Sequence, residues 1–172
     1  MELPGSIYLY TLATVSIAFV GFSALLLVIR QTVGGHMSRY DAFFTLSFIQ
    51  AGFIVVVGSL LPPLLALYAL KEENAWRLAS AIAGLLIAAF VVAFPLRRRR
   101  ATGGGPAPGY VWALLAVQTL AALGLLLGAA GNPLGPPAAS FAGALTLMLA
   151  ASGAAYVAAL GAAFKQPLAK SG

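Results

Sequence analysis

The chain has 172 residues, of which 61% are hydrophobic and only 8% are charged, and its formal net charge is +6. A soluble domain carries about 25% charged residues, so a soluble fold of this length could not bury so much apolar surface. The basic excess does not indicate nucleic-acid binding. Four of the ten basic residues form one run, Arg97 to Arg100, which directly follows an apolar segment, as basic flanks of membrane helices do.

The first apolar segment covers residues 7–29 and follows the sequence MELPGS, which has no basic residue. A secretory signal peptide needs a positively charged start, so we expect this segment to remain in the mature protein. A short loop then leads to Ser38 and Asp41, which are spaced as a capping box for the next helix. Capping is the simpler role for Asp41, and a role in transport is the alternative.

The second segment covers residues 41–70 and has no charged residue between Asp41 and Lys71. An apolar run of this kind predicts a transmembrane helix, because only a helix satisfies its own backbone groups in lipid. Pro62 and Pro63 remove two backbone donors, so we predict a kink or a break close to them. Either the bend fits a long helix against its neighbours, or it is a hinge that lines a cavity.

Three further segments follow, over residues 75–96, 110–130 and 138–164, with the flexible linker ATGGGPAPG between the first two of them. Ser80, Gly84 and Ala88 form a small-residue face, and Gly124 and Gly128 form a GxxxG pair. The last segment is so rich in Ala, Gly and Ser that we expect it to be packed closely on several sides. The sequence therefore predicts an all-α bundle of five transmembrane helices forming a single domain over residues 1–172.

The distribution of basic residues predicts the orientation in the cell membrane. Eight of the ten lie in the connections after the first and third segments or near the C-terminus, namely Arg30, Arg39, Arg97, Arg98, Arg99, Arg100, Lys165 and Lys170. Short loops that carry Lys and Arg stay in the cytoplasm. We therefore predict a multi-pass inner-membrane protein whose N-terminus lies outside and whose C-terminus is cytoplasmic.

The chain offers little material for catalysis. It has one histidine, no cysteine and four acidic residues, and none of the acidic residues lies inside a span. Paired carboxylates, an HExxH motif and a phosphate-binding loop are all missing from the sequence. We therefore predict that it is not an enzyme and has no cofactor or metal site. The same lack of ionisable groups at membrane depth argues against a proton-coupled pump.

Four spans carry a polar residue in the half of the membrane nearer the basic loops: Ser23, Gln50, Gln118 and Tyr156. At about 1.5 Å per residue, these side chains lie on the order of 10 to 12 Å from that side. Either the layer is structural, with amides and hydroxyls forming hydrogen bonds between helices, or it lines a small hydrated path. In both cases we expect Gln50, Gln118 and Tyr156 to point into the protein or an oligomer.

The favoured function is a homo-oligomeric channel or pore for ions or small solutes, because five short-looped spans without a soluble domain leave transport as the simplest activity. Five helices are few to enclose a pathway alone, which implies an oligomer. One alternative is a non-transporting scaffold or accessory subunit that packs against a membrane partner protein. The other is a lipid-binding protein that uses Arg97, Arg98, Arg99 and Arg100 on anionic headgroups. The ordinary role of such a run is to fix the topology.

Overall fold

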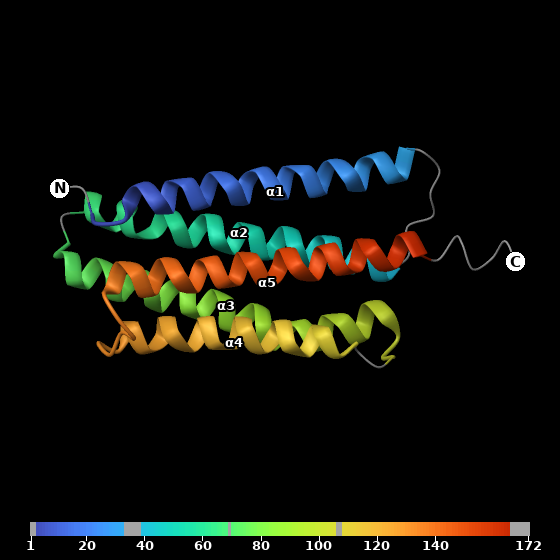
Figure 1. The fold of residues 1–172 in the computed structure, drawn as a ribbon. Helices are drawn as coiled ribbons and strands as arrows, with labels where there is room; N and C mark the ends of the chain where they lie inside the picture. Colours follow the sequence, from blue (N-terminus) through green and yellow to red (C-terminus); the bar gives the residue numbers. More distant parts are fainter. Residues whose placement is uncertain (1–2, 33–38, 69, 106–107, 166–172) are drawn as a thin grey trace, which may run out of the picture.

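The computed structural model describes residues 3–32, 39–68, 70–105 and 108–165. They form five helices: α1 (Ser6–Thr32), α2 (Arg39–Leu67), α3 (Glu72–Thr102), α4 (Gly109–Ala129) and α5 (Pro137–Lys165) (Figure 1). All five are long and apolar enough to cross a membrane. The predicted fold class, an all-α bundle of five transmembrane helices, is confirmed, and the predicted spans coincide with the helices to within a few residues at most ends.

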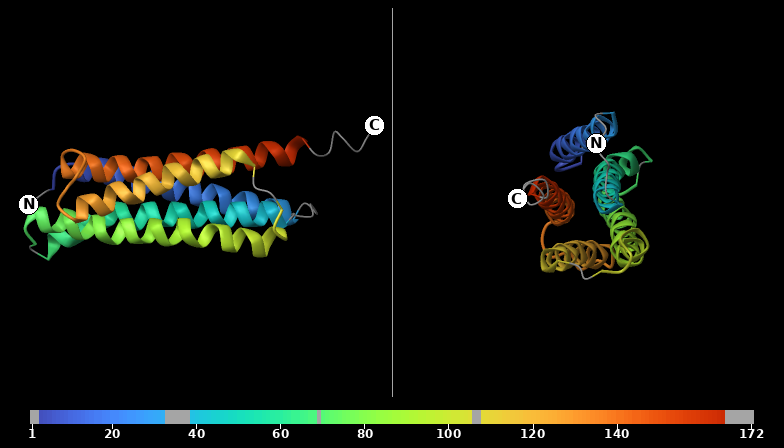
Figure 2. Two further views of the ribbon diagram at one scale, coloured as in Figure 1. Left: turned by 90° about the horizontal axis from the view of Figure 1, so that it is seen from below. Right: turned by 90° about the vertical axis from the view of Figure 1, so that its right-hand side faces the viewer.

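Helices α2 to α5 form a four-helix ring, and α1 lies outside it. Each of the four contacts its neighbour in sequence, and α5 returns to pack against α2, whereas α3 and α5 face each other across the ring with few contacts. The α1 helix packs mainly on α2 (Figure 2). Successive helices run in opposite directions, so α2 begins and α3 ends at the same end of the bundle (Figure 1). This end, which holds Arg97 to Arg100, is called the basic end below.

The α2 helix passes through both prolines without a break. It continues from Arg39 to Leu67 with Pro62 and Pro63 inside it, and Pro62 is fully buried. The predicted break at these residues is therefore wrong, and a bend there stays a prediction. Each proline removes the hydrogen bond from its own N–H to the carbonyl four residues earlier, and burial of the Pro62 ring favours keeping it in place despite this loss.

The α3 helix is longer than predicted. It runs past Pro95 and through all four arginines to Thr102, and Gly103 ends it with a positive φ of 72°. Arginine is a good helix former, and cations in the last turn interact favourably with the helix dipole. A left-handed residue after the helix suits glycine. The arginine run is therefore helical and does not belong to the loop.

The predicted capping box falls mostly outside the described part of the chain. The α2 helix begins at Arg39, directly after Ser38, which is not among the described residues. The side chain of Asp41 is not described either. A capping role for these two residues stays a prediction.

Three glycines allow close approach at three helix interfaces. A Cβ atom built on Gly52 would lie 2.4 Å from Val20 Cγ2, so α1 packs directly on the α2 backbone. A Cβ on Gly58 would lie 3.0 Å from Leu145 Cδ2 of α5, and one on Gly84 would lie 3.0 Å from Leu126 of α4. Small residues bring helices close together in lipid, where dispersion contacts hold them. The predicted small-residue face of α3 does pack on a neighbouring helix.

Candidate functional site

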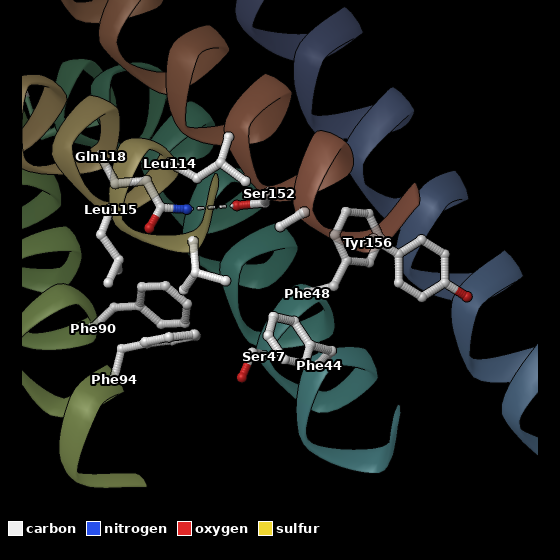
Figure 3. A pocket seen from close by; sticks show the side chains of 12 residues that line it. Phe44, Ser47, Phe48, Phe90, Phe94, Leu114, Leu115, Gln118, Ser152 and Tyr156 are labelled. Carbon is white, nitrogen blue, oxygen red and sulfur yellow. Dashed lines mark hydrogen bonds between the residues drawn. The ribbon is translucent and has the colours of Figure 1, made fainter. Parts of the chain in front are cut away.

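A small pocket lies between α2, α3, α4 and α5, in the half of the bundle nearer the basic end (Figure 3). About 30 Å³ of free space remains inside it. A water molecule needs roughly 10 to 15 Å³ on this measure, so the pocket has room for about two. Its walls are mostly aromatic and aliphatic, and they come from Phe44, Ser47, Phe48, Phe90, Phe94, Val111, Leu114, Leu115, Gln118, Ser152, Ala155 and Tyr156.

A hydrogen-bonded pair joins α4 to α5 at this pocket. Gln118 Nε2 donates to Ser152 Oγ at 3.0 Å, and Ser152 Oγ donates to the Met148 carbonyl at 2.8 Å. Both side chains are buried. Figure 3 shows the Gln118 oxygen directed toward Phe90, into the pocket. The carboxamide therefore holds two helices together and presents an acceptor to the enclosed space.

Tyr156 reaches the pocket with its ring and not with its hydroxyl. The ring stacks on Phe48 with centroids 4.7 Å apart and an interplanar angle of 17°. Figure 3 shows the hydroxyl pointing away from Gln118. On the opposite wall, Phe94 contacts Phe43 and Phe90 with centroids 5.2 and 6.2 Å apart. The pocket is therefore an apolar, aromatic-walled space with one polar pair at its edge.

The four residues of the predicted polar layer do not meet. Gln118 and Tyr156 line the same pocket, whereas Ser23 is buried elsewhere and donates to the Phe19 carbonyl of its own helix at 2.8 Å. Gln50 is exposed on the outer surface of the chain, and its Oε1 accepts a hydrogen bond from Arg97 Nη1. Gln50 therefore does not point into the single chain, where a guanidinium on α3 satisfies its amide oxygen at the surface. A direction into the interior of an oligomer stays a prediction.

The four arginines have different environments. Arg97 is half-buried between α2 and α3, with its guanidinium carbon 5.3 Å from the centroid of the Phe90 ring. Arg98 is buried, and its Nη1 donates to the Gly105 carbonyl at 2.9 Å, which ties the following loop to the helix end. Arg99 and Arg100 are exposed. The run therefore does not act as one uniform basic patch.

A second, larger cavity lies at the opposite end of the bundle, between α3, α4 and the start of α5. Its volume is about 260 Å³, and Gly124 and Gly128 form part of its wall. Arg77 and Glu73 form an ion pair at its rim with Nη2 and Oε1 2.7 Å apart. Trp76 also lines it and packs edge-on against Phe141. The GxxxG pair thus faces a hollow as well as the neighbouring helix.

Sequence reasoning missed two pairings that define these sites. Ser152 lies one helical turn before Tyr156, so its depth in the membrane and its side of the helix are predictable from the sequence. Its pairing with Gln118 is not predictable in this way. The contact between Arg97 and Gln50 was missed because the arginine run was predicted to lie after the end of the third span. A helix that continues through Arg97 would have placed this side chain beside α2.

In the described part of the chain, no group of three or more His, Cys, Asp or Glu side chains could hold a metal ion. Comparison of the chain with models of protein families, with curated proteins and with solved structures finds no match.

Proposed function

We propose that this protein is a self-associating membrane subunit that packs through the outer face of α5, with any pathway for ions or small solutes running between copies. The observation that carries this proposal is the composition of that face. Five exposed positions form one stripe along α5, and four of them are small: Ala139, Gly143, Leu147, Ala150 and Ala154. Their spacings of four, four, three and four residues keep them on one side of the helix.

Among the described residues, α5 exposes two large apolar side chains, Leu147 and Val157, and each of the other helices exposes more. Large side chains such as Phe22 on α1, Phe53 on α2, Leu85 on α3 and Leu120 on α4 are more than half exposed. Such side chains suit contact with acyl chains. A Cβ atom built on Gly143 would meet nothing within 4 Å, so the small face of α5 is open in the single chain. Small faces let two helix backbones approach closely, which is how helices associate in lipid.

The small free volume in the core of the ring supports a pathway between copies over one within the chain. The core pocket has about 30 Å³ of free space, enough for about two water molecules. The hydrogen bond from Gln118 to Ser152 joins α4 to α5 there, which supports a structural role for this pair. A permeating solute would need a continuous hydrated route, which an interface between several copies can supply.

Disulfide trapping tests the self-association. Because the chain has no cysteine, single substitutions give unambiguous cross-links. Gly143→Cys and Ala150→Cys should each form a covalent dimer of the 17.6 kDa chain on mild oxidation in proteoliposomes. The matched control is Leu120→Cys. Leu120 is 66% exposed on the outer side of α4. Cross-linking at Leu120 with none at Gly143 and Ala150 would reject α5 as the contact face.

Flux measurements then separate a pore from a scaffold. If copies enclose a pathway, proteoliposomes of the wild-type chain should pass small ions or solutes, and trapping through Gly143→Cys should alter that flux. A subunit that only scaffolds other membrane proteins should cross-link in the same way and show no flux above that of empty vesicles.

A further inference from the structure

A groove on the outer surface between α2 and α3 combines an apolar lining with one cation. Its volume is about 400 Å³. The apolar walls come from Phe53, Ile54, Leu86, Ala89, Phe90 and Ala93, and Gln50 and Arg97 lie at the end nearer the basic end of the bundle. The groove therefore places an apolar surface next to one basic side chain.

The charge of Arg97 is not balanced by the described chain. Its Nη1 donates to Gln50 Oε1 and its guanidinium carbon lies over the Phe90 ring, but both partners are neutral. Its Nε and Nη2 atoms are buried and make no hydrogen bond to the described residues. The ion pair found among those residues joins Arg77 to Glu73, at the opposite end of the bundle.

The unbalanced charge of Arg97 favours binding of an anion. Arg97 places a guanidinium with planar N–H donors at the end of an apolar groove. A buried charge is costly unless it is paired and its hydrogen bonds are made. The planar N–H groups of a guanidinium match the oxygens of a phosphate. The N–H groups of Arg97 Nε and Nη2 are the donors that such a ligand would accept from.

We propose that this groove binds an anionic phospholipid, with the phosphate at Arg97 and one acyl chain along the apolar walls. Arg97 lies five residues before the end of α3 at Thr102, which is about 7 Å of helix and suits the headgroup region. From Arg97 to Leu86 the groove follows about 16 Å of α3, which is close to the depth of one leaflet, about 15 Å. Because Nε and Nη2 are buried in the single chain, this contact requires the Arg97 side chain to change its rotamer.

The test compares phosphatidylglycerol with phosphatidylcholine, which have similar acyl chains and differ in headgroup charge. Spin-labelled forms of both lipids are mixed with the purified protein in vesicles, and the fraction of each lipid held at the protein is measured. The wild-type chain should prefer phosphatidylglycerol about fivefold, which is the scale of one basic side chain at the membrane surface. Arg97→Gln should abolish most of that preference.

Two further variants separate a built site from general surface charge. Arg100→Gln removes the same charge from an exposed position three residues away and should lower the preference much less than Arg97→Gln does. Ala89→Phe fills the groove while all four arginines remain, and it should lower the retention of phosphatidylglycerol. Equal losses in Arg97→Gln and Arg100→Gln, or full retention in Ala89→Phe, would overturn the proposal.

Another occupant would give a different result. If a carboxylate of a second copy or of another protein pairs with Arg97, the wild-type chain should show no preference between the two lipids. Arg97→Gln would then change the oligomeric state and not the lipid selectivity. That outcome would reject the lipid site and would assign the groove to a protein interface. The proposed contact through α5 does not depend on either result.

Discussion

The carboxamide of Gln118 donates to Ser152 Oγ inside a cluster of apolar side chains, whereas the carboxamide of Gln50 accepts from Arg97 on the outer surface. An amide that faces lipid without a partner would cost several kcal/mol, so each must find one. The same residue type is thus satisfied in two ways, by a hydroxyl within the core and by a cation at the edge. Residue type and depth indicate that a partner exists, but they do not identify it.

Removal of the core hydrogen bond should weaken the bundle modestly. We expect Gln118→Leu to lower the free energy of unfolding by about 0.6 to 2 kcal/mol, the range for hydrogen bonds between membrane helices. Titration with a denaturing detergent in mixed micelles measures it. The control is Thr119→Val, because Thr119 is exposed and donates to the Leu115 carbonyl of its own helix. A larger loss of unfolding free energy in Thr119→Val than in Gln118→Leu would contradict a stabilising role for the hydrogen bond between α4 and α5.

At the scale of elements, the five helices and most of their bounds are predictable, because long apolar runs without charge have few other solutions. The errors fall where local rules compete. Two prolines near the end of α2 suggested a break, but tertiary packing keeps Pro62 buried inside a continuous helix. A proline and four arginines suggested the end of the third span, but α3 continues through them to Thr102.

The contact between α1 and α2 depends on the missing side chain of Gly52. We expect Gly52→Val to cost about 1 to 3 kcal/mol through overpacking, because even a Cβ atom would lie 2.4 Å from Val20 Cγ2. Val20→Ala should recover much of that loss when combined with it. Gly21→Ala is the matched control, since a Cβ there meets nothing within 4 Å. If Gly52→Val and Gly21→Ala change the free energy of unfolding by the same amount, α1 does not pack on α2 in this register.

At the scale of the whole molecule, the sequence does not reveal which helices are neighbours. In lipid, the outward and inward faces of a helix are both apolar, so the hydrophobic pattern that orients helices in soluble proteins is lost. The ring of α2 to α5 with α1 outside depends on close contacts such as Gly58 with Leu145 and Gly84 with Leu126. The small outer face of α5, by contrast, was expected to be buried, and in the single chain it is open.

The predicted orientation places the basic end of the bundle in the cytoplasm. Single cysteines at Asn74 and Pro108 report on the two ends, since both residues are exposed and they lie next to opposite ends of the helices. In intact cells, a thiol reagent that does not cross the membrane should label Asn74→Cys and should reach Pro108→Cys only after the cells are opened. The reverse pattern would show the opposite topology.

The mass of the purified protein in lipid nanodiscs or mild detergent tests the central claim of self-association most directly. Native mass spectrometry should give a multiple of 17.6 kDa for the wild-type chain, and Gly143→Phe should shift it to 17.6 kDa without loss of helix content. Leu120→Phe, on the outer face of α4, should leave the multiple unchanged. A wild-type mass of 17.6 kDa at every protein concentration would contradict the account.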